Sequence, residues 1–194
     1  MIINSFDPII DKNSLILILG TIPGKKSLEK KEYYAYSGNK FWEIIYSIFG
    51  ADFKQSTSYV DKKEFLKSKR IALWDVLRSC NRRGSSDSKI ENPQMNDFIG
   101  LFEKHPNLKH IAFNGENALI YFVRYFPRND PSIKLEFYPK TTTVFNREIF
   151  IHRPLPPTSG RYRVSPEKIA EKIDKWRKLK ELWDAEIKSG RVSG

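Results

Sequence analysis

The stretch LILILGTIPGKKS, from Leu15 to Ser27, decides how this sequence is read. An apolar run ends at Gly20 and is followed by a proline, a second glycine, two lysines and a serine. A short apolar run bounded by turn residues predicts a buried strand. Glycine and proline just after it predict a tight turn. A strand that feeds such a turn has the outline of a phosphate-binding loop, so nucleotide binding is the first hypothesis to test.

The spacing of the turn excludes a Walker A loop. That motif needs a glycine, four residues, and then Gly-Lys-Ser or Gly-Lys-Thr. Counted from Gly20, the position where the motif needs its second glycine is occupied by Lys25. Pro23 also removes one of the backbone N–H groups that would cradle a phosphate. The stretch IALWD, ending at Asp75, has the form of a magnesium-binding strand end, but two near matches do not make a nucleotide site.

Strand-like and helix-like segments alternate along the chain, which predicts an α/β fold with a mainly parallel sheet covered on both faces. Strands are expected at 14–19, 71–74, 110–113, 135–138 and 148–152, and helices at 39–49, 96–103, 116–125 and 165–187. Ligands of such sheets bind outside the carboxyl ends of the strands. The loops that matter are therefore 20–39, 75–92, 114–116 and 152–165. We expect one domain over 1–188 and a loose tail over 189–194.

The composition favours a polyanionic partner. The chain of 194 residues holds 34 Lys and Arg against 23 Asp and Glu, a net charge of +11. Nucleic acid is the commonest partner of so basic a domain, with solubility as the alternative explanation. No run approaches the ~18 apolar residues of a membrane span, and the first residues lack the basic and apolar regions of a secretion signal. Cys80 is the only cysteine, which excludes an internal disulfide and favours a reducing, cytoplasmic location.

Two polar segments have both a functional and a structural interpretation. In YYAYSGNKFW, the tyrosines 33, 34 and 36 precede a predicted helix, where they could stack on a base or cover the core. Asn39 begins that helix, where it could cap the helix or hold a water molecule with its carboxamide. In LWDVLRSCNRRGSSDS, residues 73–88, the arginines and serines suit phosphate contacts or an ordinary polar loop. The residues alone leave these alternatives open.

The segment HRPLPPTSGRYRVSPEK, residues 152–168, carries a basic loop tip after three prolines. Ser159 and Gly160 can bring backbone donors close to a phosphate. Arg161, Tyr162 and Arg163 then present two cations and a ring, a combination that suits a wedge inserted into a base stack. A solvated basic loop is the alternative.

Together the motifs resemble a known family. GTIPGKKS, YYAYSGNKFW, IAFNGENA and LPPTSGRYRVSPEK occur in the order found in the uracil-DNA glycosylase superfamily, and the resemblance covers residues 15–176. The first two are similar to the mismatch-specific uracil/thymine branch, and ALWDVLRSCNRRGSSDS is similar to the hypoxanthine-DNA (deoxyinosine) glycosylase branch. The resemblance implies a three-layer α/β/α sandwich. It also implies a monofunctional DNA glycosylase that flips out a deaminated base, with hypoxanthine favoured, and hydrolyses its N-glycosidic bond to start base excision repair.

The resemblance also implies site residues. The mismatch-specific branch positions the attacking water with an asparagine before the proline, where this chain has Ile22, which cannot hold water. The hypoxanthine branch implies Asn39 as the catalytic residue instead. The implied base pocket consists of Gly20, Thr21, Ile22, Gly24, Tyr34 and Asn114, with Tyr34 stacked on the base and Asn114 donating to the leaving purine. The implied DNA contacts are Ser27, Ser159, Gly160, Arg161, Tyr162 and Arg163, with Arg161 as the wedge.

The implied partner is double-stranded DNA with a damaged or mismatched base, bound by a monomer without a membrane. The resemblance implies no cofactor and no metal, and the three histidines, His105, His110 and His152, lack ligand spacing. Two alternatives stay open: a mismatch-specific uracil-DNA glycosylase, and a catalytically silent DNA-binding protein of the same fold, suggested by Ile22.

Overall fold

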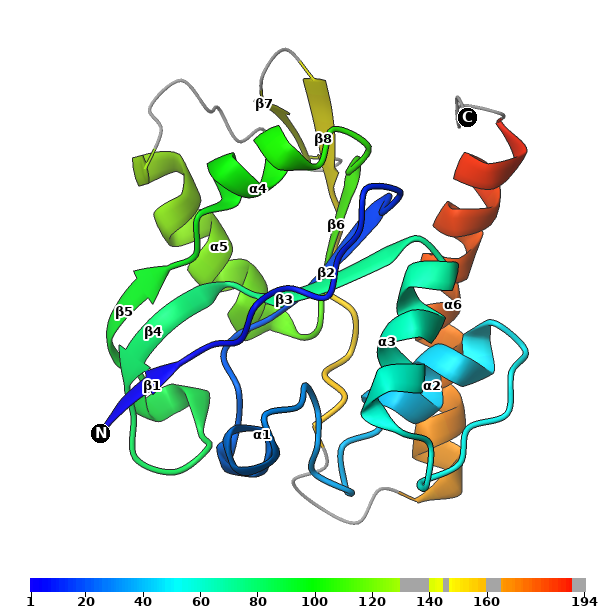
Figure 1. The fold of residues 1–194 in the computed structure, drawn as a ribbon, viewed down its shortest axis with the longest axis horizontal. Helices are drawn as coiled ribbons and strands as arrows, with labels where there is room; N and C mark the ends of the chain where they lie inside the picture. The colour runs from blue at the N-terminus through cyan, green and yellow to red at the C-terminus, as the bar shows by residue number, and fades with distance from the viewer. Residues whose placement is uncertain (130–139, 145–146, 160–164, 190–194) are drawn as a thin grey trace.

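A five-stranded sheet forms the centre of the molecule (Figure 1). The computed structural model describes residues 1–129, 140–144, 147–159 and 165–189. The strands follow the order β3-β2-β6-β8-β7, and only β7 is antiparallel to its neighbour. Their bounds are Ile16–Gly20 (β2), Ile71–Asp75 (β3), His110–Phe113 (β6), Lys140–Val144 (β7) and Arg147–Ile151 (β8).

The central strands are apolar because both faces of the sheet are covered. Every residue of β2, β3 and β6 is buried. A parallel sheet between two helical layers needs such continuous apolar runs instead of an alternating pattern. The prediction of a mainly parallel sheet is confirmed, and strand 110–113 has the expected bounds.

Helices lie on both sides of the sheet, as a three-layer sandwich requires (Figure 1). On one side lie α4 (Phe98–Lys104) and α5 (Glu116–Asn129). On the other lie α2 (Phe41–Ile48), α3 (Tyr59–Ser68) and α6 (Pro166–Lys188). The start of α6 follows its sequence signal, because Ser165 Oγ accepts a hydrogen bond from the Lys168 N–H and a proline comes next.

A second, smaller sheet corrects one prediction. Its strands β1 (Ile2–Asn4), β4 (Leu77–Asn81) and β5 (Glu91–Met95) are antiparallel, in the order β1-β4-β5. The expected loop 75–92 therefore contains a whole strand, a 3-10 turn (Asp87–Lys89) and the start of another strand. Their sequences, LRSCN and ENPQM, are polar, and Pro93 lies on an edge strand, where proline is tolerated. These features hide both strands from a search for apolar runs.

Two helices were also missed. The short helix α1 (Lys25–Lys30) lies within the expected loop 20–39, and α3 is so highly charged that Leu66 is its one fully buried side chain. The expected strand 135–138 and most of the expected tail lie outside the described residues. Within the described part of the chain, none of the helices combines the length and apolar character that a membrane crossing needs.

The carboxyl ends of β2, β3 and β6 meet at one edge of the sheet. The helix α1 and the segment that leads from β8 to α6 lie beside this edge (Figure 1). A bridge between Asn114 and Leu155 joins that segment to the residue after β6. The topology thus gathers the expected loops at the edge where α/β proteins bind ligands.

Candidate active site

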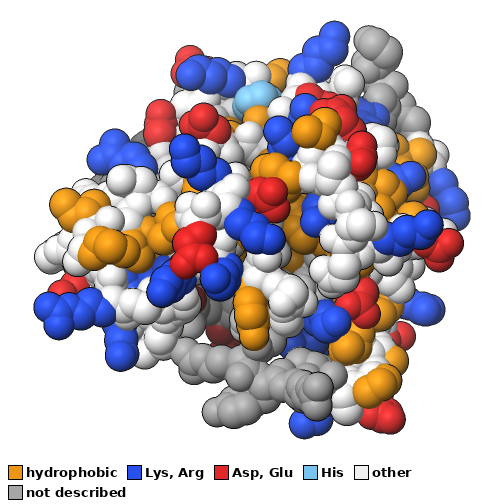
Figure 2. Space-filling model, turned by 60° about the horizontal axis from the view of Figure 1, so that its bottom comes forward, with side chains coloured by type: hydrophobic (Ala, Val, Ile, Leu, Met, Phe, Trp, Pro, Cys, Tyr) orange, Lys and Arg blue, Asp and Glu red, His pale blue; other side chains and the backbone are white. Residues whose placement is uncertain are grey.

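An open cleft of about 1230 Å³ lies at this edge, larger than the ~300–1,000 Å³ typical of small-molecule pockets. Residues from five segments line it: 20–27, 33–39, 85–88, 114–117 and 153–159. Asp75 lies at its floor, and Lys175 and Lys178 of α6 reach its border. Figure 2 brings this end of the molecule forward and shows Lys and Arg side chains spread over the surface.

The turn after β2 forms the floor of the cleft, and its backbone is fixed by hydrogen bonds from the residues that follow β3. Val76 N–H donates to the Gly20 carbonyl (2.8 Å) and Leu77 N–H donates to the Thr21 carbonyl (3.1 Å). A Cβ atom on Gly20 would lie 2.6 Å from Asp75 Oδ1 and 2.8 Å from Tyr34 Oη. Both distances are shorter than real contacts, so residue 20 must be glycine for these two polar atoms to approach the same point.

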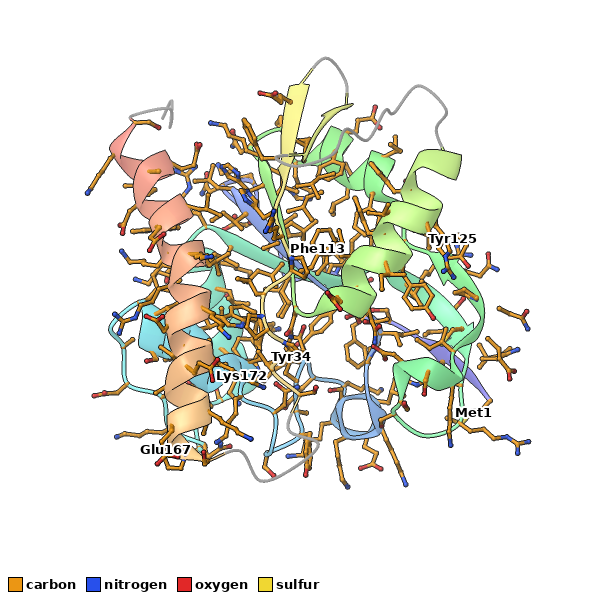
Figure 3. The ribbon with its side chains drawn as sticks, turned by 180° about the vertical axis from the view of Figure 1, so that it is seen from behind. Met1, Tyr34, Phe113, Tyr125, Glu167 and Lys172 are labelled. Atoms are coloured by element: carbon orange, nitrogen blue, oxygen red, sulfur yellow. The ribbon has the colours of Figure 1, made fainter. Side chains whose placement is uncertain are left out.

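Tyr34 lies inside the cleft in a strained backbone conformation. Its φ of 55° is unusual for a residue with a side chain. Its ring stacks on Phe41 with 4.1 Å between centroids, so a base could stack only on its opposite face. Figure 3 shows Tyr34 between α6 and α1, beneath the strand end that carries Phe113. Strain of this kind is retained where the surroundings or the function require it.

The Tyr34 hydroxyl is buried without a well-formed hydrogen bond to any described residue. Burial, and then the charge of Asp75, raise the pKa of this phenol, while the nearby Asn114 carboxamide lowers it. The hydroxyl therefore stays protonated and can donate to a group that enters the cleft. A buried donor without a partner is costly, about 1–3 kcal/mol.

Asp75 is a cleft residue that the sequence analysis did not assign to the pocket. It is 3% exposed, and burial is the main cause that raises the pKa of its carboxyl to about 7. Ser5 Oγ donates to Oδ2 at 2.7 Å. When the acid is neutral, the carbonyl oxygen is the better acceptor, which leaves the proton on Oδ1 beside Gly20. One sequence feature could have indicated this residue: Asp75 is the last residue of a strand that is otherwise apolar.

Asn39 lies at the wall of the cleft, two residues before the first residue of α2. Its Oδ1 accepts a hydrogen bond from the Phe41 N–H at 2.9 Å, two residues along the chain. The N-cap of α2 is Lys40, so the expected N-cap role of Asn39 is wrong, and its carboxamide instead closes an Asx turn at the start of the helix. The side-chain NH₂ group takes part in no hydrogen bond among the described residues, and Oδ1 keeps a second lone pair. The same carboxamide can thus hold the Phe41 N–H and orient a water molecule in the cleft.

Asn114 and Thr158 fix the far wall. The Asn114 carboxamide donates to Thr158 Oγ1 (2.8 Å) and accepts from the Thr158 N–H (2.9 Å). Thr158 is fully buried, and its carbonyl accepts from the Lys40 N–H at 3.0 Å. This connection links the residue after β6 to the start of α2 and keeps Asn114 and Asn39 in the same cleft.

The other predicted site residues fall into three groups. Thr21 and Ile22 line the floor at 9% and 8% exposure, and Ser159 is exposed at the rim. Ser27 is 6% exposed and its Oγ accepts from the Ala35 N–H, so it supports the wall and has little surface for the expected phosphate contact. Gly160, Arg161, Tyr162 and Arg163 lie outside the described residues.

The histidines form no metal site in the described part of the chain, where no group of three His, Cys, Asp or Glu side chains could hold an ion. His110 instead lies at the start of β6, 6% exposed, with Nδ1 at 3.0 Å from His152 Nε2.

Comparison with known proteins agrees with this geometry. The hypoxanthine DNA glycosylase of Methanosarcina barkeri is 44% identical over 113 residues, 58% of this chain and 71% of that protein. The hypoxanthine DNA glycosylase of Methanosarcina acetivorans is 43% identical over 118 residues, 61% of this chain and 74% of that protein.

A solved structure is similar over a larger part of the chain. It is an NMR structure of a candidate uracil DNA glycosylase from Methanosarcina acetivorans. It is 34% identical, with a TM-score of 0.67, and the match covers 93% of this chain and 99% of that one. Residues 8–180 match the uracil DNA glycosylase superfamily as a whole. With its parallel sheet, its cleft at the carboxyl ends and this match over most of its length, the chain belongs to the uracil DNA glycosylase superfamily.

Proposed function

We propose that this protein is a monofunctional DNA glycosylase that removes hypoxanthine from deoxyinosine in double-stranded DNA. The observation that carries the proposal is the convergence of Gly20, Asp75 and Tyr34 on one point of the cleft floor, with Asn39 on the wall. Both relatives named as hypoxanthine DNA glycosylases support the choice of base.

The floor offers hydrogen-bond donors to a base. The neutral Asp75 carboxyl and the Tyr34 hydroxyl each hold a proton near the point that a Gly20 side chain would occupy. Hypoxanthine carries acceptors at O6, N3 and N7. Donors that are already in place stabilise the negative charge that develops on the base as it leaves, which is the largest contribution in many enzymes.

The reaction is hydrolysis of the bond between C1′ of the deoxyribose and N9 of the base. The flipped nucleotide enters the cleft because C1′ is unreachable in the stack. The bonding electrons go to the purine, and the water on Asn39 attacks C1′ as positive charge builds up on the sugar. The water leaves its oxygen and one proton on the sugar as a hydroxyl, and its second proton neutralises the base. A carboxamide is a weak base, so Asn39 acts by orientation.

The basic surface supports a DNA substrate. Lys25, Lys175 and Lys178 line or border the cleft, and the net charge is +11. Lysine and arginine contacts release counterions from phosphates, so affinity for any duplex should fall steeply as salt rises. We expect the protein to act on DNA as a monomer, in the compartment that holds the DNA.

Single-turnover assays on duplexes that differ in one base test the proposal. Base release is scored as alkali-sensitive strand cleavage on substrates with deoxyinosine, deoxyxanthosine, deoxyuridine or no lesion. We expect deoxyinosine to react fastest, because a pyrimidine in a cleft built for a purine leaves C1′ away from the water, and ~1 Å of misplacement can cost ~100-fold. Faster release of uracil would move the protein to the uracil-acting branch. Tight, salt-sensitive binding without release of any base would indicate a DNA-binding protein without glycosylase activity.

A further inference from the structure

Arg82 is a buried cation beside the cleft that the proposed reaction does not use. It follows β4, and its side chain is 1% exposed. Its ionic partner, Asp87 Oδ1, lies at 3.6 Å from Nη1, which is long for an ion pair. A buried charge is costly unless it is paired and hydrogen-bonded. The position of this guanidinium therefore calls for a role that outweighs its burial.

The guanidinium joins two segments of the cleft wall. Its Nη2 donates to the Pro23 carbonyl in the turn after β2, and its Nε donates to the Gly84 carbonyl at 3.1 Å. The segment that begins at Gly84 contains Ser85, whose Oγ accepts from the Lys25 N–H at 3.0 Å. One fixed fork of donors thus ties the base-pocket turn to the serine segment 85–88, a geometry that arginine can provide and lysine cannot.

The same connection continues to the other wall. Asp87, the ionic partner of Arg82, also accepts a hydrogen bond from Asn117 Nδ2 at 3.3 Å. Asn117 lies in the first turn of α5, three residues after Asn114. Arg82 and Asp87 together therefore span one side of the cleft, from the turn after β2 to the start of α5.

The contact with Pro23 fixes the direction of a backbone donor. A peptide unit is planar, and its N–H points away from its C=O. Because the Pro23 carbonyl points at the buried guanidinium, the Gly24 N–H points away from it. Gly24 lines the cleft, and its N–H takes part in no hydrogen bond among the described residues. Arg82 therefore sets the orientation of a free donor at the cleft wall.

We propose that Arg82 is a positioning residue of the glycosylase reaction, which holds the turn 20–24 and the serine segment 85–88 in the geometry that receives the flipped base. This inference rests on the proposed function, since it concerns the same cleft. It assigns to Arg82 no contact with DNA. Loss of the fork lets the Pro23–Gly24 peptide rotate and the wall separate from the turn, which slows base release more than it weakens DNA binding.

The test compares Arg82→Lys with Arg70→Lys. Arg70 Nε donates to the Asn13 carbonyl at 2.8 Å, so it also ties two loops together, but just before β3, at the opposite end of that strand from the cleft. We expect Arg82→Lys to lower the single-turnover rate on deoxyinosine at least 10-fold while the duplex Kd changes less than 3-fold. Arg70→Lys should keep the rate within 2-fold of the unmodified protein.

Arg82→Ala supplies a second measurement. Guanidinium ions at concentrations well below those that unfold the protein should restore part of its base release, and methylammonium at the same concentration should not. A rate within 2-fold of the unmodified protein for Arg82→Lys would overturn the inference, as would equal losses of rate and binding. An unmodified protein that releases no base would refute the proposed function instead, so the two failures are distinguishable.

Discussion

Two clusters of polar side chains are buried in this molecule, and each holds one buried atom without a well-formed hydrogen bond to a described residue, His110 Nε2 in one and Tyr34 Oη in the other. They differ in what that atom faces. The histidine cluster, formed by His110, His152, Glu186 and Lys109, lies where the start of β6 meets the end of α6. His110 contacts His152 at 3.0 Å and Glu186 at 3.3 Å, and Lys109 Nζ lies 3.0 Å from the second Glu186 oxygen. These contacts end at Lys109, whose side chain is partly exposed.

The cleft cluster, formed by Tyr34, Asp75 and Asn114, lies at the carboxyl ends of the strands. It contains a hydroxyl without a well-formed hydrogen bond to a described residue and a carboxyl that is neutral below a pH of about 7. In the histidine cluster, His110 Nε2 lies 3.3 Å from a carboxylate of the same cluster, so no outside group is needed beside it. In the cleft cluster, the Tyr34 hydroxyl borders the open cleft, so its unpaired donor costs stability and persists where a ligand supplies the acceptor.

The largest expected effect concerns Asn39 beside the cleft cluster. Asn39→Ala should lower base release by at least ~100-fold, because the attacking water loses its orientation. It should also lose about 1 kcal/mol of folding free energy, because the hydrogen bond from the Phe41 N–H to the side chain is removed. Single-turnover rates and urea unfolding measure the two effects.

Asn39→Ser is the matched control, since a serine hydroxyl can accept the same hydrogen bond from the Phe41 N–H but lacks the carboxamide. It should be inactive and stable. Base release by Asn39→Ala within a few-fold of the unmodified protein would mean that Asn39 only supports the turn before α2.

The next effect tests the point where the cleft cluster converges. In Gly20→Ala, the new methyl group would lie 2.6 Å from Asp75 Oδ1 and 2.8 Å from Tyr34 Oη and would fill the space of the base. We expect a loss of base release of about 100-fold. Gly24→Ala is the comparison in the same turn, because its nearest contact would be an ordinary 3.6 Å to Ser85 Oγ, and its loss should be less than about 10-fold. Equal losses would show that the turn tolerates no side chain at either position.

The pH dependence of Asp75 gives a smaller effect with a defined sign. Its carboxyl has a pKa of about 7 in the fold against 3.8 in the free state, so the folded protein binds more protons. Its contribution to stability is therefore present at low pH and is lost as the pH rises from about 4 to about 7. Base release should fall above pH 7 as the donor on Oδ1 is lost.

Two variants sharpen this prediction. Asp75→Asn should flatten the pH profile of base release and raise Tm more at pH 8 than at pH 5. Ser5→Ala should move the profile to higher pH, because the Ser5 hydroxyl lowers the pKa of Asp75. Unchanged profiles in both variants would exclude Asp75 as the titrating group.

The smallest effect belongs to the histidine cluster and has the opposite sign. Burial, and then the charge of His110, lower the pKa of His152 from 6.5 to about 4, and burial also lowers the pKa of His110. Both rings are therefore neutral in the fold when they would be protonated in the unfolded chain. Their contribution is present above pH 6.5 and is lost as the pH falls toward 4.

Thermal unfolding between pH 7.5 and pH 4.5 measures this effect. His152→Gln should reduce the loss of Tm on acidification, and it should leave base release at pH 7.5 within 2-fold of the unmodified protein. A loss of base release at pH 7.5 would show that the two clusters are coupled through the sheet.

The difference between the clusters also marks what a sequence can predict. The strands ILILG, IALWD and HIAF are apolar throughout, and the cap of α6 has a local signature, so the central sheet and that helix were predictable. The small sheet was not, because its pairing of β4 with β1 is set by distant residues and its sequences are polar. Asn39 and Asn114 could be placed at the cleft from the sequence because they lie in recognisable motifs.

The buried polar residues that the sequence did not predict depend on contacts between residues that are far apart in the chain. Asp75 accepts a hydrogen bond from Ser5, which lies 70 residues earlier, and Arg82 donates one to Pro23, which lies 59 residues earlier. The histidine pair is separated by 42 residues. No local pattern marks such pairs, because burial and hydrogen bonding are decided only when the sheet has formed.

The attachment of the 153–159 segment to α6 has a consequence for how the protein is made. Trp176 Nε1 donates to the Pro156 carbonyl (2.9 Å) and Lys172 Nζ donates to the Pro157 carbonyl (2.6 Å). Both donors are synthesised more than 130 residues after Asn39. A growing chain on the ribosome can therefore form β2, β3 and β6 while the wall beside Asn39 is still unattached. The nascent protein should bind no flipped base until α6 has emerged, so the competence to cut a glycosidic bond arrives late in its synthesis.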